Sequence, residues 1–256
     1  MASMACDPAQ LTTFVLRLAD SPLILGQRLG ELVGTAPTLE EETALANIAL
    51  DLLGQSQLLL EYVAKLRDDG SSADDLAFLR EQHEYLNLLV VERPVDDFAQ
   101  TIARNLFYAS WAAVMWSELL QSSDAELAAI AAKAQKENAY HLRHAAEWVT
   151  RLGDGTDVSR ARMIAALSTL WPYAGEAFVG DDIDDAMADA GVMPHCETLE
   201  ESWRSLVGSV LDHATLDWPT GSWTQTGGKQ GRHTEALGYV LAEMQYLPRT
   251  YPGATW

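Results

Sequence analysis

The chain has 256 residues, of which 48% are hydrophobic and 21% are charged, as is ordinary for a soluble globular protein with a sizeable core. Its formal net charge of −20 argues against partners such as nucleic acid or an anionic membrane, and weakly against an unassisted site for the polyanion coenzyme A. The sequence contains neither a membrane-length apolar run nor a secretory signal pattern, so we expect a cytoplasmic protein with reduced cysteines, Cys6 and Cys196.

The first half of the chain is predicted to form helices over residues 10–32, from Thr38 to about Arg67, and over residues 73–90. In the second of these, apolar residues recur at alternating steps of three and four, and Gln55 is the only strongly polar side chain on that seam. Thr38 and Glu41 have the spacing of a capping box.

The second half also has helical periodicity. Ser123 is expected to cap a long helix that ends near Leu152, and Pro172 should kink or end a helix that opens at Ser159. Thr198 is expected to cap another helix. The predicted helices cover about 97–121, 123–152, 159–172, 182–190, 198–216 and 234–247, with a long loop over 217–231.

No strand-like alternation competes with this pattern, so the predicted fold class is all-α. The first two helices are predicted to form one hairpin, and the helices at 97–121 and 123–152 a second. Two such hairpins supply the four helices of a four-helix bundle. We expect a single domain over residues 1–256, with a core bundle at about 10–152 and a C-terminal helical extension at about 156–256.

Ferritin-like dimetal bundles take one Glu from each of two helices and Glu-x-x-His from each of the other two. The corresponding stretch of the second helix carries Leu52 and Gln55. In the helix over 123–152, His141 has Asn138 three residues before it, so this helix lacks the motif as well. Counting back one hairpin length leaves Asp20 as the only acid available from the partner helices. We therefore predict no metal site and no catalytic residue on this chain.

A residual polar cluster is predicted at the position where such bundles hold metal. Glu137, His141 and His144 fall on one seam that should be buried, and a buried charge needs a partner. We expect a hydrogen-bonded network in which Glu137 accepts from His141. Two alternatives are a single weakly bound ion at these residues and an exposed helix face. The predicted cluster consists of Asp20, Asp51, Gln55, Glu137, His141 and His144.

Other candidates carry weaker signals. His83 is expected on a solvated face, and His213 beside Asp212 has no nucleophile at hand. The Gly-rich stretch at 226–231 lacks the spacing of a phosphate-binding loop and is expected to be a structured loop or a partner contact. The tryptophans at helical positions, expected to be core or interface anchors, are Trp111, Trp116, Trp148, Trp171 and Trp203.

Many segments in order resemble the family of C subunits of bacterial 1,2-phenylacetyl-CoA epoxidases, over almost the whole chain. One departure is Ser110, where some members carry an acidic residue. The matching segments include LRLAD at 16–20, QRLGE at 27–31, LANIALDLLGQ at 45–55, DFAQTIAR at 97–104, YHLR at 140–143, GDGTDVS at 153–159, HTEALG at 233–238 and LAEMQYL at 241–247.

This resemblance implies a ferritin-like, non-catalytic subunit of a multicomponent oxygenase. A catalytic subunit of the same fold would carry the diiron centre and epoxidise the ring of phenylacetyl-CoA, and a separate reductase would pass electrons from NADPH. The chain would bind and stabilise that catalytic subunit, and it could form a homodimer when alone. Two rival functions stay open: a ferritin-like metal-binding oxidase or oxygenase active on its own, and a binding module for coenzyme A esters.

Overall fold

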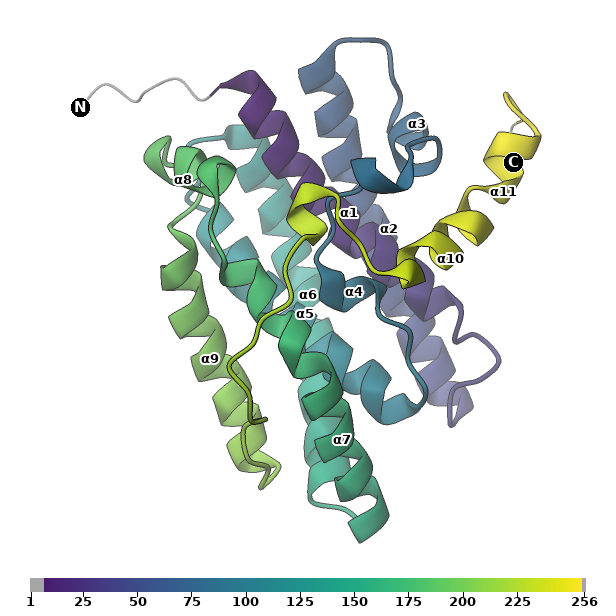
Figure 1. The fold of residues 1–256 in the computed structure, drawn as a ribbon, viewed down its shortest axis with the longest axis vertical. Helices are drawn as coiled ribbons and strands as arrows, with labels where there is room; N and C mark the ends of the chain where they lie inside the picture. The colour runs from purple at the N-terminus through teal and green to yellow at the C-terminus, as the bar shows by residue number, and fades with distance from the viewer. Residues whose placement is uncertain (1–6, 255–256) are drawn as a thin grey trace. The chain divides into compact units, whose positions relative to one another are not determined.

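The computed structural model describes residues 7–254, and the regular structure within them is helical (Figure 1). The described residues divide into two compact units. One unit is Val95–Thr226, and the other combines Asp7–Pro94 with the C-terminal residues from Gly227 onward. These edges do not coincide with the expected division near residues 152–156, and the expected single domain stays a prediction.

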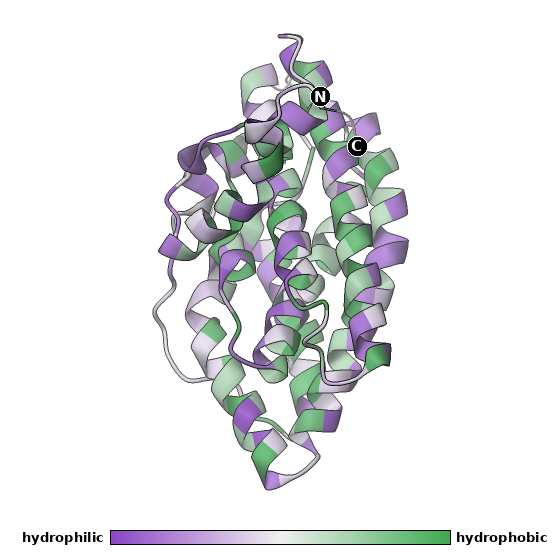
Figure 2. Cartoon of the chain, turned by 90° about the vertical axis from the view of Figure 1, so that its right-hand side faces the viewer, coloured by the Kyte–Doolittle hydropathy of each residue, from purple (hydrophilic) through white to green (hydrophobic). Residues whose placement is uncertain are grey.

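The discontinuous unit is built on a hairpin of α1 (Pro8–Gly30) and α2 (Leu39–Arg67). The side chain of Asp7 caps α1, and Thr38 caps α2 by accepting from the Glu41 backbone N–H, as the sequence predicts. Gly26 lets the two helices approach closely, because a Cβ there would lie 3.1 Å from the side chain of Leu53. Hydrophobic and hydrophilic residues are interspersed along the long helices, as expected for helices that bury one face (Figure 2).

The helix predicted over 73–90 is wrong beyond its first turns. The chain forms α3 (Ala73–Phe78), a 3₁₀ turn (Gln82–Glu84) and the short α4 (Leu89–Glu92). Between them, the backbone N–H of Leu86 donates to Asp20 and that of Leu88 donates to Ser21. Because α1 side chains satisfy these backbone groups, the segment does not need helical hydrogen bonds. The unit ends with α10 (Glu235–Met244) and α11 (Tyr246–Thr250).

The continuous unit is organised around α5 (Phe98–Leu119), which is buried over most of its circumference. It packs against α6 (Ala125–Gly153), α7 (Asp157–Ala174) and α9 (Cys196–His213). The buried Trp203 of α9 donates its indole N–H to the Phe107 carbonyl of α5 at 3.1 Å. The short α8 (Asp182–Asp189) and a 3₁₀ turn (Gly175–Phe178) complete the unit.

Three helix starts in this unit differ from the predicted ones. Asp124 rather than Ser123 caps α6, while the Ser123 hydroxyl donates to Ala190. Thr156 caps α7. The capping box predicted at Thr198 is wrong, because α9 begins at Cys196. Several polar residues lie near each start, so periodicity alone does not fix the first residue of each helix.

Within residues 7–254, none of the helices has the length and apolar character needed to span a membrane. Cys6 lies outside the described residues, and Cys196 is buried.

Candidate functional site

Asp20, the acid that α1 contributes to the predicted cluster, is fully buried and engaged by fixed donors. Its Oδ2 accepts from Arg80 Nη1 at 3.0 Å and from the Leu86 backbone N–H at 2.8 Å, and its Oδ1 accepts from Arg80 Nη2. Burial lowers the pKa of Arg80, but the charge of Asp20 outweighs this and raises it. The guanidinium therefore supplies the positive charge that this carboxylate needs.

On α2, Leu52 and Gln55 are both buried, and Asp51 is half-buried at the edge of their seam. The predicted seam of this helix is thus confirmed around Gln55. Leu52 offers no donor atom to a metal, and Gln55 offers a neutral amide in place of an imidazole. The residue types on this helix do not fit the Glu-x-x-His arm of a dimetal centre.

On α6, the predicted seam is buried at Leu127, Ile130 and Ala134, but at its next position Asn138 is buried in place of Glu137. Glu137 is half-buried and lies 3.8 Å from Lys133, while the neighbouring Asn138 is buried. Asn138 donates its amide N–H to the Ala109 carbonyl of α5 at 2.9 Å. His141 and His144 are buried, as predicted. The residue three before His141 is thus an amide committed to a backbone carbonyl.

Three of the predicted cluster residues lie on α1 and α2 and three on α6, so each set belongs to a different unit. Within residues 7–254, no group of three or more His, Cys, Asp or Glu side chains could hold a metal ion. On residue type alone, the seams carry Leu52, Gln55 and Asn138 where Glu-x-x-His needs a carboxylate or an imidazole. This donor set does not fit a diiron centre. The expected absence of metal stays a prediction for solution measurements.

A second buried polar cluster, which the sequence did not reveal, ties the C-terminal segment to α4. The side chains of Glu92 and His233 are both fully buried, and Glu92 Oε2 lies 2.8 Å from His233 Nδ1. Glu92 also accepts from the Asn87 amide at 2.9 Å, and from the Thr234 backbone N–H and hydroxyl at 2.7 and 2.8 Å. We call these four residues the Glu92–His233 clasp.

The hydrogen bonds of the clasp favour the positively charged form of His233. Nδ1 faces the Glu92 carboxylate and Nε2 lies 2.7 Å from the Tyr85 carbonyl, and both of these groups only accept. Two acceptors favour a ring that donates from both nitrogens, which is the imidazolium form. Burial alone lowers the pKa of His233, but the hydrogen bond and charge of Glu92 outweigh it and raise the pKa above the ordinary 6.5.

Tyr85 and Gln245 extend this polar region toward α11. The Tyr85 hydroxyl donates to the Ala77 carbonyl at 2.6 Å and accepts from Gln245 Nε2 at 2.9 Å. Burial raises the pKa of Tyr85 to about 12, so the phenol stays protonated at neutral pH. The Arg80 guanidinium lies 4.2 Å from the centre of the Tyr85 ring. The Asp20–Arg80 pair is therefore linked through Tyr85 to the C-terminal segment.

The Gly-rich stretch at 226–231 packs against residues 83–89 and is a structured loop, as expected. A Cβ on Gly228 would lie 2.1 Å from the Asn87 carbonyl oxygen, and one on Gly231 would lie 2.1 Å from that of His83. Gly231 also has a left-handed φ of 72°. These glycines allow close backbone contact. Arg17 donates to the Lys229 carbonyl at 3.2 Å, which fixes the loop to α1.

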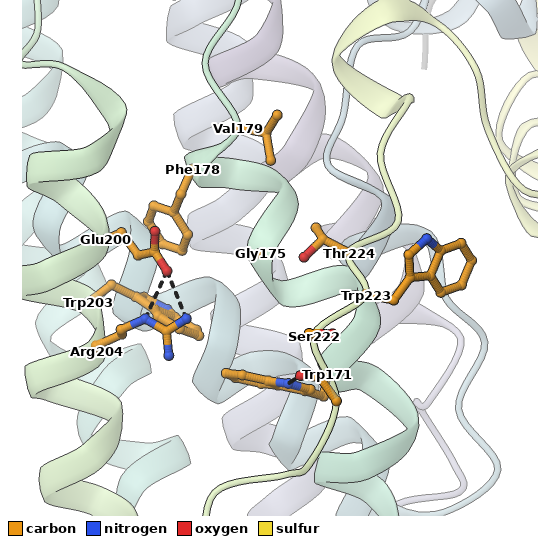
Figure 3. Close-up of a pocket in the computed structure, with 11 residues that line it drawn as sticks. Trp171, Gly175, Phe178, Val179, Glu200, Trp203, Arg204, Ser222, Trp223 and Thr224 are labelled. Carbon is orange, nitrogen blue, oxygen red and sulfur yellow. Dashed lines mark hydrogen bonds and ion pairs between the residues drawn. The ribbon is translucent and has the colours of Figure 1, made fainter.

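The tryptophans mark the core of the continuous unit, as expected for anchors. Trp111, Trp116 and Trp203 are buried, while Trp148 and Trp171 are half-buried. The Trp171 and Trp203 rings stack with centroids 6.1 Å apart and line a cavity of about 190 Å³. Figure 3 shows the Glu200–Arg204 pair in the lining of this cavity, with the Arg204 Nε donating to Glu200 at 2.8 Å. Ligand pockets typically measure roughly 300–1,000 Å³, so this cavity is small for an organic ligand.

The remaining histidines do not form sites with other candidate residues. His83 is exposed, as predicted, although it lies in a 3₁₀ turn and not on a helix. His213 is exposed and its Nδ1 lies 2.6 Å from the Ser209 carbonyl of its own helix. His195 is exposed and lies 3.9 Å from Asp185.

Comparison with known proteins agrees with the resemblance in the sequence. A family model described as "Phenylacetic acid catabolic protein" matches residues 2–256. The C subunit of 1,2-phenylacetyl-CoA epoxidase from Escherichia coli (strain K12) is 48% identical over 247 residues, covering 96% of this chain and 99% of that protein.

A solved structure shows the fold alone: protein 19 with aldehyde deformylating oxidase activity from Synechococcus has a TM-score of 0.56 at 18% identity. The match covers 88% of this chain and 97% of that one, which confirms the expected all-α, ferritin-like fold class. The family match and the relative extend over nearly the whole sequence. The chain belongs to the phenylacetic acid catabolic protein family, as a relative of the C subunit of 1,2-phenylacetyl-CoA epoxidase.

Proposed function

We propose that this chain is a non-catalytic structural subunit of a multicomponent phenylacetyl-CoA epoxidase, and that it binds and stabilises the catalytic subunit. The observation that carries the proposal is the pair of altered motifs on buried helix faces, Leu52 with Gln55 and Asn138 with His141. A bundle that supplies these side chains has a packed interior in place of a set of carboxylate and imidazole ligands. The named relative, itself a subunit of an epoxidase, supports the assignment to a complex.

In this proposal the diiron centre belongs to the partner catalytic subunit, and a separate reductase delivers electrons from NADPH. The residues of this chain provide a rigid support. Asp20 with Arg80 and Glu92 with His233 fix the short segments of one unit to α1 and α4. Asn138 and Trp203 fix α6 and α9 to α5 in the other.

The test is reconstitution of epoxidation from purified components. The catalytic subunit is expressed with and without this chain, and its yield, its iron content and its turnover of phenylacetyl-CoA with the reductase are measured. We expect a stable hetero-oligomer, iron that follows the catalytic subunit, and turnover that requires both chains. A catalytic subunit that is equally stable and active without this chain would contradict the proposal.

The rival function, an oxidase that binds iron by itself, depends on His141 and His144, which are both buried on α6. Iron analysis of the isolated chain distinguishes it. About two irons per chain, lost on mutation of His141, would establish the rival in place of the structural role.

A further inference from the structure

The C-terminal strap, residues 227–254, is attached to its unit by several polar contacts. α10 buries Ala236, Leu237, Val240 and Leu241, whereas α11 buries no residue. Gln245 donates to the Arg80 carbonyl at 2.8 Å, and Arg249 donates to the same carbonyl at 3.0 Å. The Glu92–His233 clasp fixes the beginning of α10. The position of α11 is thus fixed without apolar burial of its own.

The outer face of this strap exposes large side chains that would ordinarily be covered. Tyr239, Tyr246 and Tyr251 are 72%, 62% and 55% exposed, and Leu247 is also exposed. Scattered apolar residues are normal on a surface, but tyrosines concentrated on one short segment are typical of binding interfaces. Figure 1 shows α10 leading into α11 at the C-terminal end of the chain.

A groove of about 640 Å³ adjoins the exposed residues of α11. Its apolar lining comes from Phe78 and Leu79 on the α3 side, and from Pro248, Tyr251 and Pro252 on the strap. Leu79 is itself exposed. The groove has room for an apolar side chain of another molecule, which would extend the contact from the strap onto α3.

The groove and α10 both carry acidic side chains. Asp74 and Asp75 line the groove, and Glu235 and Glu243 are exposed on α10. Hydrogen bonds from Ser72 lower the pKa of Asp75, which keeps this carboxyl ionised. Arg249, the basic residue of the groove, donates to Glu81 at 3.2 Å. A complementary surface would carry lysine or arginine at its rim.

This acidity also argues against a second copy of the chain as the occupant. A symmetric interface brings the same patch of both copies together, so the acidic rims would face each other. Each copy carries a formal charge of −20, which adds to the repulsion. A different chain with an apolar centre and a basic rim fits the surface better.

We propose that the outer face of the C-terminal strap, with the groove beside α3, is the docking surface for the catalytic subunit, which presents an apolar centre within a basic rim. The inference rests on the proposed function and adds the face through which the partner is bound. Tyr239, Tyr246 and Tyr251 supply the apolar contact, and the acidic rim orients the encounter.

The experiment measures the affinity of the full-length chain for the purified catalytic subunit by titration calorimetry. The test variant combines Tyr239→Ala, Tyr246→Ala and Tyr251→Ala. The matched control combines Leu50→Ala, Val158→Ala and Trp223→Ala, which are equally exposed large residues outside the strap. Because all six side chains are exposed, both variants should keep the wild-type circular dichroism and melting temperature. We expect the test variant to bind roughly tenfold or more weakly, and the control to bind as wild type does.

A second measurement examines the acidic rim. Asp74→Asn combined with Glu243→Gln should slow association by several-fold at low salt, with little effect on dissociation. The difference from wild type should shrink as the salt concentration approaches physiological values. Faster association of this variant would show that the partner's rim is not basic, and would overturn the assignment.

The outcomes separate the two proposals. If wild type binds and the tyrosine variant binds equally well, the docking surface is wrong while the structural function stands. If wild type does not bind the catalytic subunit at all, the proposed function fails first. If the isolated chain sediments as a dimer that the tyrosine variant converts to monomer, the strap joins two copies of this chain, and the inference is overturned.

Discussion

Asp20 shows how one residue can be buried with its charge kept. The Arg80 guanidinium and the Leu86 N–H satisfy its carboxylate, so removal of either charge would leave the other buried without compensation. We predict that Asp20→Asn lowers the free energy of unfolding by about 3 kcal/mol, measured by urea denaturation. In the Arg80→Gln background the same change should cost much less. Asp189→Asn, an exposed control, should leave the urea midpoint close to that of the wild type.

Asn138 and Glu137 are neighbours whose environments differ sharply. Asn138 is buried and donates to the Ala109 carbonyl, whereas Glu137 is 22% exposed and lies beside Lys133. Asn138→Leu should therefore lower the free energy of unfolding by about 1–2 kcal/mol, and Glu137→Gln by less than about 0.5 kcal/mol. Thermal and urea melts of the two variants test the order. If Glu137→Gln were more destabilising than Asn138→Leu, Glu137 would lie at the centre of the buried face, as the periodicity alone predicts.

At the level of elements, the Glu92–His233 clasp makes the attachment of α10 sensitive to pH. The folded-state pKa of His233 is raised, so its contribution is complete below about pH 6.5 and is lost as the pH rises through the raised value. We predict that amide exchange in α10, corrected for the intrinsic effect of pH, becomes faster as the pH rises through the raised pKa of His233. His233→Gln should remove the pH dependence and lower stability at pH 6 by about 3 kcal/mol. His213→Gln, at an exposed position, should leave the profile unchanged.

Periodicity alone predicts the long helices of the chain. The long helices α1, α2, α5 and α6 are predicted to within a few residues, because each has an extended apolar seam and a polar cap. The segment from residue 79 to residue 91 is not predicted correctly, because its backbone N–H groups donate hydrogen bonds to Asp20 and Ser21 of α1. A sequence pattern does not register hydrogen bonds from side chains more than 60 residues away.

At the scale of the whole molecule, a structural subunit should be free of iron when purified alone. The buried faces of α2 and α6 offer Leu52, Gln55 and Asn138 in place of metal ligands. We predict well under one iron per chain by elemental analysis after expression in iron-rich medium, and no change in melting temperature on addition of a chelator. A chelator that destabilises the chain would show a bound metal that contributes to folding.

The helical class, the long helices and the missing metal motifs can be predicted from the sequence, because they depend on residue type and on periodicity along one helix. It also carried the family, since the resemblance extends over nearly the whole chain. Which residues become partners depends on the folded structure. Asp20 meets Arg80, Glu92 meets His233, and Asn138 rather than Glu137 occupies the buried face of α6. These pairs join residues far apart in the chain, and their energies come from burial and hydrogen-bond geometry, which exist only after folding.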